Sequence, residues 1–232
     1  AANGNIVFEQ AGYLHSYALN GSSATKLKIG IAADLLELRG RFVRGGDYIR
    51  AGDISPTGAR VVFDSRGEII TAPAEKGDFR NLTQTTGAHE KYPSWSPDGK
   101  TIAYFSDASG EYQLYLKPQD GKGEAKVFKL TGTGFYAYPE WSPDSKKINF
   151  TDNARNFYVV DIASGAITKI DADELYVPGP FRYMHGSWSF DSKWIAYTKI
   201  TETQFKRVYL YSTEQKKSFA LTDGLSDASD PK

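Results

Sequence analysis

A repeated motif constrains the fold of this chain more than any other feature of its sequence. The motif occurs as Tyr92-Pro-Ser-Trp-Ser-Pro-Asp-Gly-Lys, Tyr138-Pro-Glu-Trp-Ser-Pro-Asp-Ser-Lys and His185-Gly-Ser-Trp-Ser-Phe-Asp-Ser-Lys, with a weaker copy at Ile54-Ser-Pro-Thr-Gly-Ala-Arg. The anchor residues Ile54, Trp95, Trp141 and Trp188 are 41, 46 and 47 residues apart. A period of roughly 40 to 45 residues is typical of a four-stranded propeller blade, although helical repeats of similar length exist.

The content of each repeat favours strands over helices. After the anchor segment Pro93–Trp95, one repeat has short runs rich in aromatic and β-branched residues, which are Thr101–Phe105, Tyr112–Leu116 and Ala125–Leu130. Turns that contain glycine separate these runs, as in antiparallel meanders. Because one twisted sheet cannot bury both of its faces, neighbouring sheets must stack around an axis. The sequence therefore predicts an all-β fold, a β-propeller of about five four-stranded antiparallel blades.

The repeats also suggest where the blades begin and end. We expect them at residues 3–29, 47–83, 89–131, 136–170 and 183–222, with an insertion or crossover at 30–46. The first blade lacks its anchor strand, and residues 223–232 are expected to start a further one. Two alternatives follow: the tail completes the first blade and closes a five-bladed ring, or the chain is a fragment of a larger propeller.

Composition narrows the classes of partner. The chain has 28 Lys and Arg against 28 Asp and Glu, whereas nucleic-acid and anionic-membrane surfaces need a basic face. No apolar run approaches the roughly 20 residues of a membrane span. Without cysteine there are no disulfides, thiolate nucleophiles or cysteine-ligated metals. We therefore expect a soluble protein, cytoplasmic or periplasmic, with no metal, cofactor, nucleic-acid or membrane partner, and with a peptide or protein partner instead.

Catalytic motifs are missing from the sequence. It has no Gly-x-Ser-x-Gly elbow, no His-Glu-x-x-His and no phosphate-binding loop. The repeated Asp98, Asp144 and Asp191 are expected to accept a hydrogen bond from the backbone two residues on, as Asp does in tight turns, rather than to bind a metal. The anchor tryptophans are expected to pack between sheets. An independent hydrolase would need a Ser-His-Asp triad built from distant segments.

The candidate binding residues are aromatic. If the anchor strand runs along the axis, the side chains three residues before the anchor gather at one mouth of the central channel. Rings with polar tips suit peptide recognition, so we predict that this mouth binds a peptide or partner chain. The alternative is that the rings only cap the sheet edges. The predicted residues are Tyr92, Tyr138 and His185, with Tyr136, Tyr183 and His89 nearby in the connecting loops.

The motif Trp-Ser-Pro-Asp-Gly-Lys followed by Ile-Ala-Tyr resembles the WD-type repeats of TolB-like propellers, propeller-bearing serine peptidases and tricorn proteases. The segments Ile6–His15, Gly67–Thr83 and Tyr104–Tyr112 resemble the propeller region of tricorn-like proteases more narrowly. In that family two propellers precede a PDZ-like module and a serine-protease core, and the propellers are thought to route peptides. The resemblance implies that residues 1–29 end the first propeller and that the second opens near residue 47.

That resemblance implies that this chain has a non-catalytic function. Nothing here matches the protease core of the family, so no catalytic residue is carried over. The favoured hypothesis is a non-catalytic propeller that handles or gates peptide substrates, with the protease domains of a parent chain as partners. The alternatives are a TolB-like propeller that acts alone as an interaction scaffold and, third, a small independent hydrolase.

Overall fold

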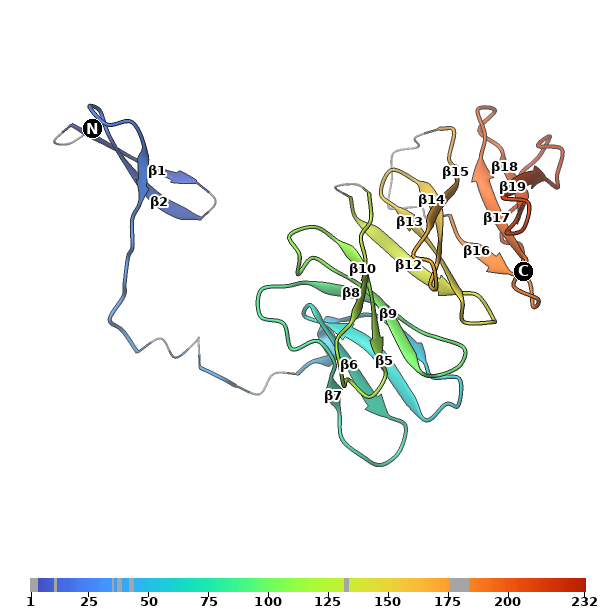
Figure 1. The fold of residues 1–232 in the computed structure, drawn as a ribbon, viewed down its shortest axis with the longest axis horizontal. Helices are drawn as coiled ribbons and strands as arrows, with labels where there is room; N and C mark the ends of the chain where they lie inside the picture. The colour runs from blue at the N-terminus through green and yellow to red at the C-terminus, as the bar shows by residue number, and fades with distance from the viewer. Residues whose placement is uncertain are drawn as a thin grey trace. The chain divides into compact units, whose positions relative to one another are not determined.

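The computed structural model describes residues 4–10, 12–34, 36, 39–41, 44–131, 134–175 and 184–232. It confirms the all-β prediction, since the described elements are strands apart from short 3-10 turns such as Gly46–Tyr48. The chain forms two compact units, Ala1–Val43 and Arg44–Lys232 (Figure 1). Each unit is considered by itself below.

The first unit is a single antiparallel sheet. It contains β1 (Asn5–Gln10), β2 (Tyr13–Ala18) and β3 (Ala24–Lys26), so the sheet has three described strands, one fewer than a complete blade. Phe8 stacks on His15 with ring centroids 5.4 Å apart. None of the described residues of this unit is buried.

The described residues of the second unit form four sheets of four antiparallel strands, each with its strands in chain order. The first two sheets are β4 (Ile49–Ile54), β5 (Arg60–Ser65), β6 (Glu68–Pro73) and β7 (Arg80–Asn81), then β8 (Glu90–Trp95), β9 (Thr101–Ser106), β10 (Gln113–Pro118) and β11 (Lys126–Phe128). The last two are β12 (Tyr136–Trp141), β13 (Lys147–Asp152), β14 (Asn156–Asp161) and β15 (Ile167–Ala172), then β16 (Gly186–Trp188), β17 (Trp194–Ile200), β18 (Lys206–Ser212) and β19 (Lys217–Ala220). Every repeat is therefore a meander, as its sequence predicts.

The repeated Ser-x-Asp segments form the turn between the first two strands of a sheet. Ser96 Oγ donates to Asp98 Oδ1 at 2.6 Å, and the same oxygen accepts the Lys100 N–H at 3.0 Å. The turns that contain Asp144 and Asp191 repeat both bonds. The predicted turn chemistry is confirmed at all three aspartates.

The core lies between neighbouring sheets. Trp95, at the end of β8, packs against Val62 and Ile69 of the preceding sheet, and Trp141, at the end of β12, packs against Phe105 in the same way. Trp188 packs against a third cluster between the last two sheets. The anchor tryptophans therefore fill the space between sheets, as predicted. Ile54, at the end of the first strand of the second unit, is instead 67% exposed.

The C-terminal tail bonds to the last sheet. The Ala228 N–H donates to the Lys206 carbonyl oxygen at 3.0 Å, and the Asp230 N–H donates to Thr198 Oγ1 at 3.2 Å. Residues 223–232 form no strand, and these two bonds hold the tail against β17 and the residue that begins β18.

Candidate functional site

The first strands of the sheets in the second unit share the wall of one hollow. A cavity of about 550 Å³ is lined by Arg50–Asp53 of β4, Tyr92–Ser94 of β8, Tyr138–Glu140 of β12 and by His185, which directly precedes β16. The first strands of three sheets, and the residue before the first strand of the fourth, therefore face one hollow, as the inner strands of propeller blades do. We call it the channel wall.

Three predicted residues meet on this wall. The ring centroids of Tyr92 and Tyr138 are 5.0 Å apart, and those of Tyr138 and His185 are also 5.0 Å apart. Tyr138 is 41% exposed, His185 is exposed and Tyr92 is partly buried. The structure thus brings the three rings into one continuous series, here called the aromatic row, with Tyr138 in the middle.

A backbone irregularity aims the two tyrosines. Tyr92 and Tyr138 have positive φ values of 54° and 53°, and the strand register shifts at both positions. A bulge of this kind redirects a side chain, and a bulky residue at positive φ persists only where its surroundings hold it. The Tyr92 N–H donates to Oδ2 of Asp64 at 3.1 Å, and Oδ1 of this buried carboxylate accepts the Ala51 N–H at 2.8 Å. Asp64 therefore connects β4 to the bulge of β8.

Polar residues occupy the position directly before the anchor residue, two residues after the position of the tyrosines. Asp53 and Glu140 occupy this position in β4 and β12. Asp53 accepts the Ile54 and Trp95 N–H groups at 2.8 and 2.7 Å. Glu140 is exposed to solvent, but the atoms of the concave wall around it displace part of its water and raise its pKa, while a hydrogen bond from Asn149 opposes the rise. Asp53 and Glu140 are not among the candidate residues predicted from the sequence, although both directly precede an anchor residue in it.

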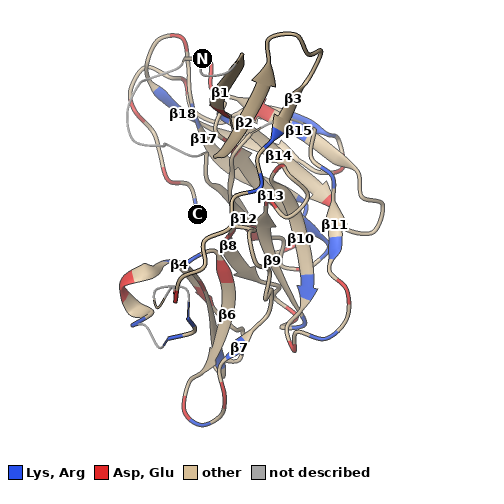
Figure 2. Ribbon diagram, turned by 90° about the vertical axis from the view of Figure 1, so that its left-hand side faces the viewer, with Lys and Arg blue, Asp and Glu red and all other residues tan. Residues whose placement is uncertain are grey.

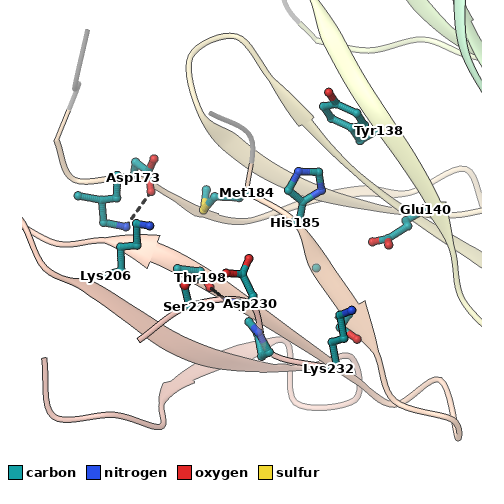
Figure 3. A pocket seen from close by; sticks show the side chains of 14 residues that line it. Tyr138, Glu140, Asp173, Met184, His185, Thr198, Lys206, Ser229, Asp230 and Lys232 are labelled. Atoms are coloured by element: carbon teal, nitrogen blue, oxygen red, sulfur yellow. Dashed lines mark hydrogen bonds between the residues drawn. The ribbon is translucent and has the colours of Figure 1, made fainter. Parts of the chain in front are cut away.

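A second cavity, of about 580 Å³, begins at the same residues. Tyr138, Glu140 and His185 line it together with the C-terminal residues Ser229–Lys232. Figure 3 shows these side chains around the hollow, with Asp173 and Lys206 at its far side. Because the three residues line both cavities, they lie at the centre of the candidate site.

The other predicted residues do not join the aromatic row. Tyr136 is 4% exposed and stacks on Phe105 with centroids 5.7 Å apart, so the structure places it in the core between two sheets. His89 is exposed, and its Nδ1 lies 2.7 Å from the Tyr112 hydroxyl beside another hollow. Tyr183 lies outside the described residues.

Charge and metal chemistry give few further candidates. Figure 2 shows acidic and basic residues along the same loops and strands. Within the described ranges, no group of three or more His, Cys, Asp or Glu residues is arranged to hold a metal ion. No helix among the described residues is long and apolar enough to cross a membrane.

Meandering four-stranded sheets that turn their first strands toward one hollow define the class of this protein, a β-propeller. A family model described as the tricorn protease second beta propeller domain matches residues 49–232. The chain belongs to this family. The family model therefore covers all four sheets of the second unit.

Solved structures resemble the chain in fold. Tricorn protease aligns with a TM-score of 0.66 and 18% identity over 96% of this chain, which spans 21% of the tricorn chain. TolB from Acinetobacter baumannii aligns with a TM-score of 0.57 and 18% identity, and the alignment covers 97% of this chain and 53% of the TolB chain. Puromycin hydrolase aligns with a TM-score of 0.58 and 16% identity, and the alignment covers 94% of this chain and 34% of the hydrolase chain. No curated protein sequence gives a significant match.

Proposed function

We propose that this chain is a non-catalytic propeller of a tricorn-like serine protease and that its channel wall binds peptide substrates on their way to or from the protease domains of the parent chain. Membership of the tricorn second-propeller family supports the link to proteolysis. The observation that carries the peptide role is the aromatic row, three adjoining rings on a concave wall.

The chemistry of the row fits peptide binding. Aromatic rings with polar tips offer large apolar contact areas together with hydrogen-bonding groups, and they dominate the energy of many binding sites. The two cavities, of about 550 and 580 Å³, have the size of typical ligand sites, which is about 300 to 1,000 Å³. The bulges at Tyr92 and Tyr138 hold the rings toward the channel before a ligand arrives, which reduces the ordering cost of binding.

The test is a binding titration of the full chain with a panel of fluorescently labelled peptides. Tyr138→Ala removes the middle ring and interrupts the row, so we expect it to weaken peptide binding about tenfold, which corresponds to about 1.4 kcal/mol. Phe79→Ala is the matched control, because Phe79 is 71% exposed and lines neither cavity. Equal affinity of the Tyr138→Ala variant and the unmodified chain would refute the proposal.

A further inference from the structure

Glu140 differs from the other carboxylate at the same repeat position. The two oxygens of Asp53 are occupied by the backbone N–H groups of Ile54 and Trp95. Glu140 has only a long hydrogen bond, 3.4 Å from Asn149 Nδ2, and forms no ion pair with any residue that the structure describes. Glu140 therefore has no comparable structural task and retains capacity to accept hydrogen bonds.

The surroundings of Glu140 are aromatic and concave. Its strand neighbour Tyr138 and the adjoining His185 line the same two cavities, one of which Figure 3 shows. Asn149, its hydrogen-bonding partner, is almost fully buried. Glu140 itself is exposed, so a ligand can reach it, and the atoms of the surrounding concave wall raise its pKa. In such an environment, a charge gains more from an opposite charge than it would in bulk water.

A carboxylate beside aromatic faces is suited to one class of ligand group. Cations bind to ring faces through the π quadrupole, and they form the strongest hydrogen bonds with carboxylates. We propose that Glu140 and the ring of Tyr138 form a subsite for a positively charged group of a bound peptide, a Lys or Arg side chain or the N-terminal ammonium. This inference rests on the proposed peptide function and specifies the charge of the substrate.

Matched peptides test the subsite on the full chain. One N-acetylated peptide carries a central Lys, a second carries Gln there, and a third is the Gln peptide with a free N-terminus. We expect the Lys peptide, the free-amine peptide or both to bind about tenfold more tightly than the acetylated Gln peptide, as for a hydrogen bond to a charged group. The stronger of these two peptides identifies the source of the cation.

Variants locate the preference at Glu140. Glu140→Gln keeps the size of the side chain and should bind all three peptides equally, with the affinity of the acetylated Gln peptide unchanged. Glu140→Lys should instead favour an acetylated peptide with a central Glu. Glu214→Gln is the matched control, because it removes one negative charge from an exposed turn that lines neither cavity.

The possible failures are distinguishable. If the peptides bind and Tyr138→Ala weakens them, but Glu140→Gln leaves the discrimination between Lys and Gln intact, the charge subsite is wrong and the peptide function stands. Equal binding of all three peptides by the unmodified chain would likewise overturn the subsite alone. If no peptide binds, or Tyr138→Ala has no effect, the peptide function itself fails, and the subsite fails with it.

Discussion

Single serine hydroxyls connect the repeated turns of neighbouring sheets. The Asp98 N–H donates to Ser145 Oγ at 3.1 Å, and the Asp144 N–H donates to Ser192 Oγ at 3.0 Å. Both serines have positive φ, 58° and 61°, at the place where an earlier turn has Gly99 at 71°. A non-glycine residue in this conformation costs about 1 kcal/mol. A hydrogen bond contributes about the same amount, so the bond of a serine can offset its backbone strain. Either serine or glycine is therefore tolerated at this position of the turn.

We expect Ser145→Ala to lower the free energy of unfolding by about 1 kcal/mol, because it keeps the backbone strain and loses the bond. Ser145→Gly should lower it by less, since glycine adopts positive φ without strain. Urea unfolding of both variants at one pH measures the difference. If Ser145→Ala is as stable as the unmodified chain, the hydroxyl contributes nothing between the sheets.

Lys91 is a second residue with an unusual environment. Its Nζ lies 3.8 Å from the ring centroid of Tyr112 and 4.7 Å from that of Phe135. It forms no ion pair with a described residue. Burial lowers its pKa to about 8, although Asp107 and Asp64 act in the opposite direction. Burying the Lys91 ammonium therefore destabilises the folded chain, and the contacts with the aromatic rings do not fully offset this loss of hydration.

This cost predicts a pH dependence. Below about pH 8 the lysine is protonated in both states and the penalty is constant. Between pH 8 and the usual pKa near 10.5 the unfolded chain binds more protons, so stability rises with pH. We expect Lys91→Met to be more stable than the unmodified chain at pH 7, and this gap to narrow by pH 10. Urea unfolding at both pH values measures the gap, and a gap that is constant or widens would contradict the assignment.

At the scale of elements, strands were predictable and their irregularities were not. The run Thr101–Phe105 corresponds to β9 within one residue, because alternation and flanking turns are local signals. The bulge at Tyr92 depends on Asp64, which is 28 residues away and carries no motif. Tyr136 was expected in a loop near the mouth, but Phe105 and Phe150 from two sheets enclose it. Contacts between sheets determine both the bulge at Tyr92 and the burial of Tyr136. The sequence pattern of a single repeat carries no information about such contacts.

A buried charge cluster joins β15 to β17. Tyr197 Oη donates to Asp171 Oδ2 at 2.6 Å, and Lys199 Nζ donates to Asp171 Oδ1 at 2.8 Å. Lys199 also pairs with Glu174 at 2.9 Å. Burial works against the charge of Lys199, but the two carboxylates prevail and raise its pKa. The cluster thus ties the segment that leaves the third sheet of the second unit to the fourth.

Removing the central carboxylate should loosen this connection. Asp171→Ala leaves the buried ammonium of Lys199 with one partly exposed partner, and we expect a loss of about 3 kcal/mol of unfolding free energy. Glu174→Ala is the matched control and should cost about 1 kcal/mol or less, because the Glu174 side chain is 36% exposed. Chemical unfolding of both variants tests the difference. Similar small losses would show that Asp171 is not the centre of the cluster.

At the scale of the whole molecule, the core is unevenly distributed. Among the described residues, the three hydrophobic clusters lie within Arg44–Lys232, where strands such as β9 and β13 are almost completely buried. The described residues of the first unit contain no buried side chain. Because burial of apolar surface supplies most of the free energy of folding, the two units should differ greatly in local stability.

Hydrogen exchange on the full chain measures this difference. We expect amides of β1 and β2 to exchange within the shortest labelling times, although every strand residue there is paired, since a small sheet without a buried face is only marginally stable. Amides of β9, β13 and β17 should exchange slowest, through global unfolding. A chain of residues 44–232 should keep the protection of these three strands unchanged. If β1 and β2 were as protected as β9, the first unit would have to gain its stability from contacts other than its own three strands.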